Sequence, residues 1–241
     1  MPLSQNWVWP KGYKNVVGQG KSCMRNTEDR PVHKGLRNKL VSLIREKGIT
    51  DEHVLQAMMN VPRHFFLDSA FEQQAYEDRA FPIGEDQTIS HPYTVAYQSQ
   101  LLQIKPFDKV LEVGTGSAYQ ATILCELQAK VFSIERQKKL FDANKEFLLL
   151  RKYHSLRMFF GDGFEGLPTY APFDKILITA AAPFIPEKLL SQLKVGGFMV
   201  LPLNEGDVQR MHRITKLADG SFQEEKFDAF SFVPMLVGKR R

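Results

Sequence analysis

The sequence predicts an α/β protein built on a doubly wound, mostly parallel seven-stranded sheet of the Rossmann-like type, with N-terminal helices and a late antiparallel strand. Three observations support this prediction. From Lys109 onward, apolar strand-like runs alternate with helix-like stretches. A loop with two glycines, residues 114–116, joins the first of these strands to a helix. The chain has 241 residues, 43% of them hydrophobic, and is long enough to bury a full α/β core.

The elements follow in order along the chain. Helices are expected at 36–47 and 51–60, the second capped by Thr50 or Asp51, and an irregular segment follows through residue 87. Pro92 fits the first turn of another helix. The alternating part predicts strands at 109–113, 130–134, 156–160, 174–179 and 197–202 and helices at 118–128, 137–151 and 186–193. Late strands are expected at 209–217 and 230–236, joined across Asp219-Gly220 and paired antiparallel.

One catalytic domain is expected over residues 36–238, with a flexible basic extension at 1–35 and a solvated basic tail at 239–241. The net charge of +5 lies in the ends of the chain, because residues 1–40 carry +6, the last three +3 and the 198 residues between them −4. The basicity is therefore not in the fold, and it does not predict nucleic-acid binding.

Cysteine spacing and hydropathy limit the class of protein further. The two cysteines, Cys23 and Cys125, lie far apart, and the six histidines show no metal-binding spacing. No apolar run is long enough to span a bilayer, and the N-terminus lacks the pattern of a signal peptide. We therefore expect a cytoplasmic, metal-free monomer that binds neither nucleic acid nor membranes.

The loop Gly114-Thr115-Gly116 has the character of a nucleotide site, because glycines let the backbone turn tightly and approach a ligand. A dinucleotide loop would need a third glycine where Tyr119 stands, and a phosphate loop would need Gly-Lys-Ser/Thr. Glu112 would repel pyrophosphate but suit a cationic cofactor end, and Glu135 ends the next strand, where a carboxylate grips ribose hydroxyls. These features indicate S-adenosylmethionine; a generic strand-to-helix turn is the alternative.

A second polar cluster, residues 81–93, reads Phe-Pro-Ile-Gly-Glu-Asp-Gln-Thr-Ile-Ser-His-Pro-Tyr. Ser90 stands where a helix N-cap belongs, and capping alone would explain it. A hydrolase would pair Ser90 with His91, but neighbours at a helix start point in different directions and the chain has no G-x-S-x-G elbow. His91 is therefore expected to be a surface or supporting residue.

This cluster and the glycine loop, read as Leu111-Glu-Val-Gly-Thr-Gly-Ser-Ala-Tyr-Gln, resemble those of protein-L-isoaspartate O-methyltransferases. The resemblance covers about residues 38–237, and the Pro-Ile-Gly…Gln-Thr-Ile-Ser stretch is close to diagnostic. Shorter matches lie in the family's order: Val61-Pro-Arg-His, Ala75-Tyr-Glu-Asp, Ile134-Glu-Arg, Gly161-Asp-Gly, Ala171-Pro-Phe-Asp, Thr179-Ala-Ala, Gln192-Leu-Lys-Val-Gly-Gly and Phe232-Val-Pro.

The resemblance implies a class I methyltransferase that uses S-adenosylmethionine to methylate the free carboxylate of L-isoaspartyl residues in damaged proteins and peptides. The neighbouring amide nitrogen then closes a succinimide, which hydrolyses partly to normal aspartate. Ser90 would be the catalytic residue. A carboxylate is already ionised at neutral pH, so no general base is needed, and a neutral hydroxyl can orient the acceptor oxygen without neutralising it.

The resemblance also assigns residues to the cofactor. Glu112 would line its methionine end, Glu135 would hold the ribose and Asp162 would accept from the adenine amino group. For Asp162, a turn residue between two glycines is an equal alternative. The full expected set is Gln87, Thr88, Ile89, Glu112, Gly114, Thr115, Gly116, Glu135, Arg136, Asp162, Gly163, Thr179, Ala180 and Gln209, with no metal ligand.

Three departures from the family pattern bear on the site. Ala118 replaces a usual glycine, Glu85-Asp86 places two acids at the mouth, and His91 stands where glutamine is common. The acids would disfavour anionic peptides, so they put substrate preference in question more than activity. The alternatives to isoaspartyl repair are methylation of another carboxylate, a phenol or a small molecule, and a catalytically silent cofactor-binding module.

Overall fold

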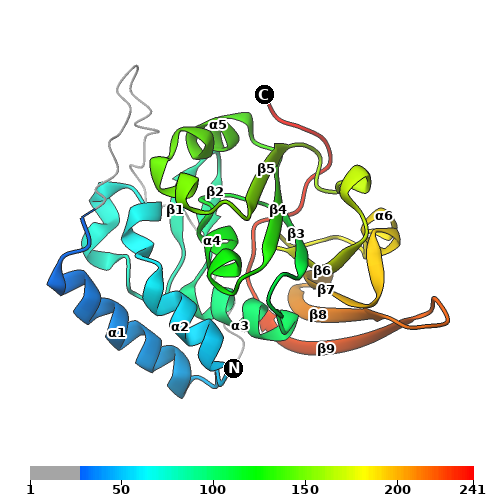
Figure 1. The fold of residues 1–241 in the computed structure, drawn as a ribbon, viewed down its shortest axis with the longest axis horizontal. Helices are drawn as coiled ribbons and strands as arrows, with labels where there is room; N and C mark the ends of the chain where they lie inside the picture. Colours follow the sequence, from blue (N-terminus) through cyan, green and yellow to red (C-terminus); the bar gives the residue numbers. More distant parts are fainter. Residues whose placement is uncertain (1–27) are drawn as a thin grey trace.

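A seven-stranded sheet forms the centre of the protein, which a computed structural model describes over residues 28–241 (Figure 1). The strand order is β5-β4-β3-β6-β7-β8-β9. Five strands run parallel: β3 (Lys109–Val113), β4 (Lys130–Glu135), β5 (Leu156–Phe160), β6 (Phe173–Ile178) and β7 (Leu193–Glu205). β8 (Val208–Lys216) and β9 (Phe222–Phe230) continue the sheet antiparallel. The doubly wound, mostly parallel sheet is confirmed, and its order reverses beside β3, where such folds bind ligands.

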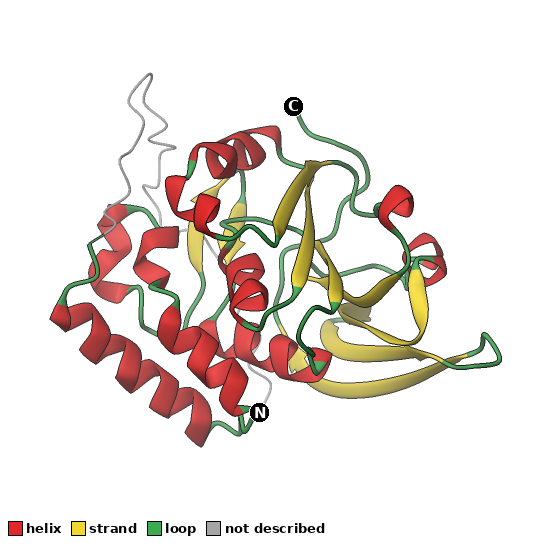
Figure 2. Ribbon diagram, viewed as in Figure 1, coloured by secondary structure: helices red, strands yellow, loops and turns green. Residues whose placement is uncertain are grey.

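Two apolar layers enclose the sheet, and α1 and α2 lie side by side at one end of the molecule (Figure 2). Val110, Val131 and Leu177 face the N-terminal helices, whereas Leu111 and Ile176 face the opposite layer. The helices are α1 (Pro31–Glu46), α2 (Glu52–Asn60), α3 (Pro92–Leu102), α4 (Tyr119–Glu126), α5 (Lys138–Glu146) and α6 (Glu187–Ser191). Single 3-10 turns are η1 (Arg63–Phe66), η2 (Ser69–Gln74), η3 (Leu148–Lys152) and η4 (Pro168–Tyr170). Within residues 28–241, none of the helices has the length and hydropathy to cross a membrane.

A small antiparallel ribbon stands apart from the main sheet and carries the second polar cluster of the sequence. It pairs β1 (Phe81–Gly84) with β2 (Gln87–Ile89). Glu85 and Asp86 form its turn, with φ values of +50° and +57° in the left-handed region. Ser90 follows β2 directly, so the ribbon places Ser90 just before the start of α3.

Two expected elements are wrong in their extent. The strand expected at 230–236 is replaced by β9, an edge strand whose Glu224, Glu225 and Lys226 give it a polar pattern. Residues 231–236 instead leave the sheet and run beside Ala181. The helix expected at 137–151 ends at Glu146, because Phe147 takes an extended backbone and packs its ring 5.5 Å from that of Phe66.

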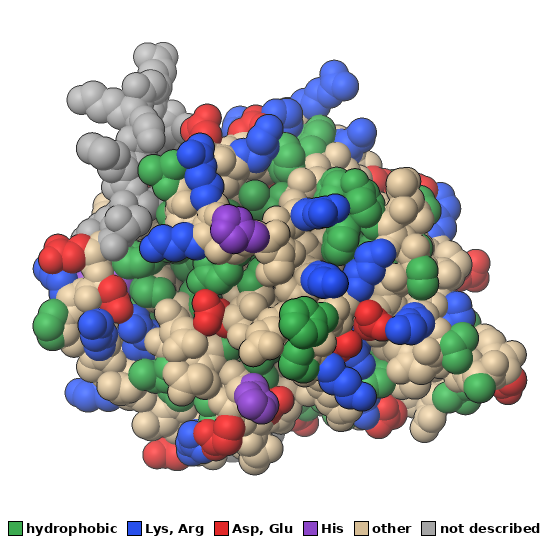
Figure 3. All heavy atoms as spheres, in the orientation of Figure 1, with side chains coloured by type: hydrophobic (Ala, Val, Ile, Leu, Met, Phe, Trp, Pro, Cys, Tyr) green, Lys and Arg blue, Asp and Glu red, His purple; other side chains and the backbone are tan. Residues whose placement is uncertain are grey.

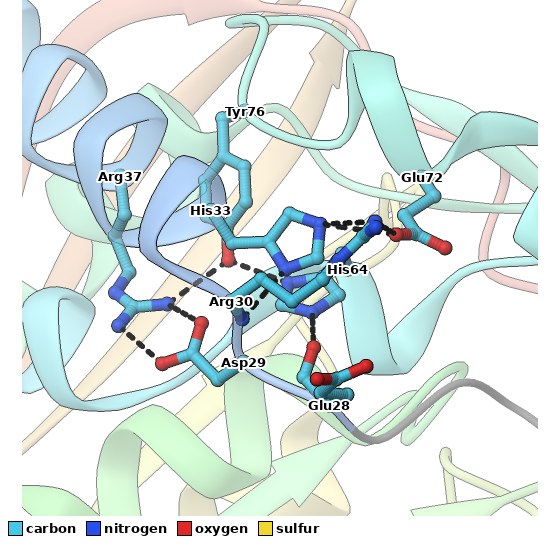
Figure 4. A network of polar contacts seen from close by, with 8 residues as sticks. All are labelled: Glu28, Asp29, Arg30, His33, Arg37, His64, Glu72 and Tyr76. Carbon is cyan, nitrogen blue, oxygen red and sulfur yellow. Dashed lines mark hydrogen bonds and ion pairs between the residues drawn. The ribbon is translucent and has the colours of Figure 1, made fainter.

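The helix expected at 36–47 begins earlier than predicted, because α1 starts at Pro31, and residues 28–30 are held against the fold. Figure 4 shows the polar network that holds them. The Arg37 guanidinium donates to both carboxylate oxygens of Asp29, at 3.1 and 2.9 Å, and to the Tyr76 hydroxyl at 3.0 Å. The ring of His64 lies between Tyr76, 2.7 Å from Nδ1, and the Glu28 carbonyl, 3.2 Å from Nε2. The remainder of the expected extension, residues 1–27, lies outside the described residues.

The same network contains the group of possible metal ligands found in the described part of the chain. Ligand atoms of Asp29, His33 and His64 lie within 4.8 Å of one another. Each is already engaged: Asp29 by Arg37, His33 by Glu72 at 3.0 Å, and His64 by Tyr76. A metal ion bound there would have to displace the Arg37 guanidinium. We therefore interpret these contacts as interactions that hold residues 28–30 against the fold.

Candidate active site

The glycine loop turns tightly between β3 and α4, at the point where the strand order reverses. Gly114 N and Thr115 N both donate to the Ile134 carbonyl, at 2.9 and 3.2 Å. Gly114 has φ +100°, and a Cβ there would lie 2.4 Å from Thr179 Oγ1. Only glycine at position 114 therefore allows Thr179, which follows β6, to pack against one side of the loop, while the other side of the loop stays open to the cavity. Ala118 takes a left-handed φ of +68° at the N-cap of α4, which explains the glycine usual in the family.

A cavity of about 840 Å³, its open mouth included, lies over this loop. Open α/β sheets bind their ligands in a crevice at this position, outside the carboxyl ends of the strands. The expected residues that line it come from β2, the glycine loop, the end of β4 and the loops after β5 and β6. They are Gln87, Thr88, Ile89, Ser90, Gly114, Thr115, Gly116, Glu135, Arg136, Gly163, Thr179 and Ala180.

Glu135 supplies the carboxylate of the cavity. It is buried, its Oε2 accepts from Gly116 N at 2.8 Å and its Oε1 accepts from Gln137 N at 2.8 Å. Burial raises the pKa of this carboxyl, and the backbone donors act in the opposite direction. A carboxylate offers about four acceptor sites, so the group can still accept from a ribose hydroxyl.

Glu112 does not line the cavity, contrary to the expectation that it meets the methionine end of the cofactor. Its side chain is fully buried behind the loop, where Oε2 accepts from the Ser133 hydroxyl. Ser133 in turn lies 2.6 Å from the Thr115 hydroxyl. Because both faces of a central parallel strand are covered, its acid meets the neighbouring strand instead of solvent. Burial raises the pKa of Glu112 to about 8, so the group is largely neutral at pH 7.

Asp162 and Gln209 also lie outside the lining, because each binds the backbone of the C-terminal segment. Asp162 Oδ1 accepts from Phe164 N at 2.9 Å, as a turn residue does, and Oδ2 accepts from Gly238 N at 2.7 Å. Gln209 donates to the Phe232 carbonyl at 3.2 Å and accepts from Phe232 N. Both side chains thus fix the course of the chain after β9.

That C-terminal segment closes one side of the cavity, which the sequence did not predict. Figure 1 shows it (red) passing the central strands toward α5. Arg136 donates to the Gly238 carbonyl at 3.0 Å, and Arg240 N donates to the Arg136 carbonyl at 2.8 Å. The tail at 239–241, expected to be solvated, is therefore anchored at Arg240. Residues missed by sequence reasoning line the cavity here and beside the loop: Val95, Val113, Ser117, Tyr119, Gln120, Ile134, Val233, Pro234, Met235 and Leu236. The apolar run 233–237 was the signal available in the sequence, and it was assigned to a strand.

The two unusual acids, Glu85 and Asp86, are outside the cavity lining, and both have basic partners. Glu85 forms an ion pair with Lys139 at 2.9 Å, and Asp86 lies 3.6 Å from the Arg240 guanidinium. Figure 3 shows acidic and basic side chains interspersed on the face it draws. The negative charge of the two acids is therefore largely balanced, and they join the β1–β2 turn to α5 and the tail.

Ser90 lies between this cavity and a smaller hollow of about 290 Å³. Thr88, Ser90, Thr179 and Val233 line both, and the hollow is completed by Ala80, His91, Thr94, Ser231 and Phe232. The N-cap of α3 is His91, so Ser90 does not cap the helix. Among the described residues nothing hydrogen-bonds to the Ser90 hydroxyl, while His91 Nδ1 lies 3.0 Å from the Asp78 carbonyl. A neutral hydroxyl thus lies between the cavity over the glycine loop and a second hollow, and the lining of that hollow contains no Lys, Arg, Asp or Glu among residues 28–241.

The cavity fits S-adenosylmethionine better than a phosphate ligand. Arg136 is the one basic residue in the lining formed by the described chain, and its guanidinium is bound to backbone carbonyls. The walls combine apolar side chains, such as Ile134 and Met235, with the Glu135 carboxylate. An adenosyl group with a cationic end and no phosphate matches this chemistry.

Comparison with known proteins supports the same interpretation of the cavity. A family model described as Protein-L-isoaspartate(D-aspartate) O-methyltransferase (PCMT) matches residues 35–240. Protein-L-isoaspartate O-methyltransferases of Christiangramia forsetii and Salinibacter ruber are 55% and 45% identical, covering 86% and 83% of this chain and 97% and 91% of theirs. A solved structure of that name has a TM-score of 0.76 at 26% identity over 84% of this chain and 67% of its own. A Plasmodium falciparum crystal structure in complex with S-adenosyl-L-homocysteine has a TM-score of 0.73 at 24% identity, covering 87% and 99%. The chain belongs to the protein-L-isoaspartate(D-aspartate) O-methyltransferase family of class I S-adenosylmethionine-dependent methyltransferases.

Proposed function

We propose that the chain methylates the free carboxylate of L-isoaspartyl residues in damaged proteins and peptides, and that Ser90 aligns the acceptor oxygen. The observation that supports this role is the position of Ser90 between the cavity over the glycine loop and the hollow beside it. S-adenosylmethionine, when bound, supplies a methyl carbon on a positively charged sulfur. The donor and acceptor can then meet across the wall formed by Thr88, Ser90, Thr179 and Val233.

The residues present suit a reaction that needs position and not proton transfer. A carboxylic acid of ordinary pKa is ionised at pH 7, so the acceptor requires no general base. His91 is no base for Ser90, because its Nδ1 faces the Asp78 carbonyl. The Ser90 hydroxyl can donate one hydrogen bond to a carboxylate and leave its charge intact. An arginine at this place would stabilise the negative charge of the carboxylate, which is being lost in the transition state, and this would slow the reaction.

For the cofactor we propose a division of roles among the lining residues. Glu135 accepts from the ribose hydroxyls, Gly114 and Gly116 let the methionine end approach the loop, and Thr179 with Ala180 closes the site near the methyl group. Glu112, Asp162 and Gln209 act indirectly in this proposal, through the loop and the C-terminal segment that they hold. We further propose that the protein acts as a monomer in a reducing cytoplasm, to which the free, half-buried thiol of Cys125 is suited.

Ser90→Ala tests the role of the hydroxyl. We expect it to lower kcat on an isoaspartyl peptide by about tenfold to a hundredfold and to change the dissociation constant of S-adenosylhomocysteine little, because it removes one aligning hydrogen bond. The matched control is Ser191→Ala, since the Ser191 hydroxyl donates to the Lys188 carbonyl on exposed α6, outside the cavity lining. Equal losses in turnover and cofactor binding would refute the alignment role.

The substrate is tested with an isoaspartyl peptide and its aspartyl twin of the same sequence. Transfer of labelled methyl from the cofactor to the isoaspartyl peptide alone is the expected result. Methylation of both peptides, or of neither while a small carboxylic acid or phenol is methylated, would favour another acceptor. Cofactor binding without any turnover would favour a silent binding module.

A further inference from the structure

We infer that Arg63 is a positioning residue for the methyl transfer, holding Ser90 in place through its backbone; this inference rests on the proposed role of Ser90. Arg63 opens η1 and is fully buried, with 0% of its surface exposed. Its Nη2 donates to the Ser90 carbonyl at 2.8 Å, and its Nε donates to the Ala75 carbonyl at 3.0 Å. One planar guanidinium therefore fixes two turns of the segment that ends in Ser90.

The charge of Arg63 makes a purely structural role costly. Burial lowers the pKa of the guanidinium to about 10, so it stays protonated at neutral pH. It forms no ion pair with a carboxylate of residues 28–241, and its Nη1 is buried without a hydrogen-bond partner among them. Burying an unpaired cation costs several kcal/mol, whereas an apolar side chain of similar volume would fill the same space without that cost. The hydrogen bonds that the charged group does make go to the carbonyls of Ala75, Arg79 and Ser90, and the bond to Ser90 is the shortest of the three, at 2.8 Å.

Arg63 also connects the acceptor side of the site to the cofactor side. Its guanidinium carbon lies 4.9 Å from the centroid of the Tyr119 ring, and Tyr119 begins α4 directly after the glycine loop. Tyr119 and Ser90 both line the large cavity. The forked group thus contacts both the Ser90 segment and the residue that begins α4 after the loop. Lysine cannot replace it, because an ammonium is a point donor that neither stacks as a plane nor reaches two fixed carbonyls in the same geometry.

Arg63→Lys and Arg63→Gln test this inference in the full-length chain. We expect both to fold and to bind S-adenosylhomocysteine within about threefold of the wild type, while kcat on the isoaspartyl peptide falls by about tenfold or more, because small misplacements of an aligning group are costly. Adding Ser90→Ala to either variant should lower kcat little further, because Arg63 acts through Ser90. The matched control is Arg37→Lys, a second buried arginine, which binds Asp29 and Tyr76 and touches neither Ser90 nor Tyr119 by hydrogen bond. It should lower the melting temperature and leave kcat unchanged.

The outcomes separate this inference from the proposed function. If Ser90→Ala leaves kcat unchanged, the role of Ser90 itself fails. If Ser90→Ala lowers kcat but the Arg63 variants do not, or if their losses add to that of Ser90→Ala, Arg63 is not a positioning residue. Loss of folding or of cofactor binding in both Arg63 variants would likewise overturn the inference, because the residue would then serve the fold as a whole.

Discussion

Replacing Glu112 by glutamine should make the protein more stable above neutral pH. Glu112 is fully buried, and one of its oxygens has no hydrogen-bond partner among the described residues. Burial in the first place, and the nearby charge of Glu135, raise the pKa of Glu112, while the hydrogen bond from Ser133 lowers it. Glutamine has nearly the same shape and carries no proton to lose, so the substitution isolates the ionisation.

The sign and the size follow from the two pKa values. The pKa is 4.5 in the unfolded chain and about 8 in the folded protein. Between these pH values the unfolded chain has lost the proton that the folded protein keeps, so the stability of the wild type falls as pH rises. Each pKa unit corresponds to 1.36 kcal/mol, which gives at most about 5 kcal/mol over the whole window. Because a buried group relaxes and admits water when it ionises, we expect about 2–5 kcal/mol.

Urea unfolding followed by circular dichroism at pH 5, 6.5 and 8 measures this difference. Wild type and Glu112→Gln should be similar at pH 5 and should diverge progressively toward pH 8, with the variant more stable. The control is Glu146→Gln on the exposed side of α5, which should leave the pH dependence unchanged. A constant difference between wild type and Glu112→Gln at all three pH values would show that the buried carboxyl does not carry a raised pKa.

Two further predictions concern the cofactor. Glu135→Ala should raise the dissociation constant of S-adenosylhomocysteine by about tenfold in calorimetry, because a charge-assisted hydrogen-bond pair to the ribose is lost. An unchanged constant, or an equal rise in the exposed control Glu187→Ala, would exclude Glu135 from the site. Removing residues 237–241 should raise the dissociation constant of S-adenosylhomocysteine by about tenfold or more and speed its dissociation, because the hydrogen bonds of Gly238 to Asp162 and Arg136 hold the cavity wall. Removal of Arg241 alone should have no effect. Equal behaviour of the two truncated chains would show that the segment does not close the site.

The parallel strands could be predicted from local pattern, and the C-terminal part of the sheet could not. β3, in the centre of the sheet, begins and ends where the sequence predicts, because a parallel strand covered on both faces reads as an apolar run bounded by turn residues. β5 also has the predicted bounds, although it lies at the sheet edge and is only half-buried. β9 carries two consecutive acids, Glu224 and Glu225, followed by Lys226 at the sheet edge, and no periodicity distinguishes such a strand from a loop. The start of α1 was missed for another reason: Asp29 and Arg30 are held by Arg37 and Glu72, which are partners that only the folded chain brings together.

The candidate site divides in the same way. Ser90, Glu135 and the glycine loop were predictable because each sits at the end of a strand, where the topology of the fold alone places it in the cavity. Asp162 and Glu112 are the acids of the expected motifs, but the direction in which each side chain points depends on the hydrogen-bond donors that surround it. Gly238, 76 residues after Asp162, supplies one of those donors, and Ser133 on the neighbouring strand supplies another. No local pattern reports such partners.

The buried polar groups around this site act mostly on the backbone, and the chemistry explains why. An ionised acceptor and a charged donor need no proton carrier, so the protein contributes alignment and the exclusion of water. Alignment of a loop is a matter of fixing its carbonyls and N–H groups, which is what Arg63, Asp162 and Gln209 do. A site that used general-base catalysis would instead show a titratable side chain facing the Ser90 hydroxyl, and His91 is turned toward the Asp78 carbonyl. The rate of this enzyme should therefore depend more on residues that hold Ser90 and the C-terminal segment than on any ionisation in the cavity.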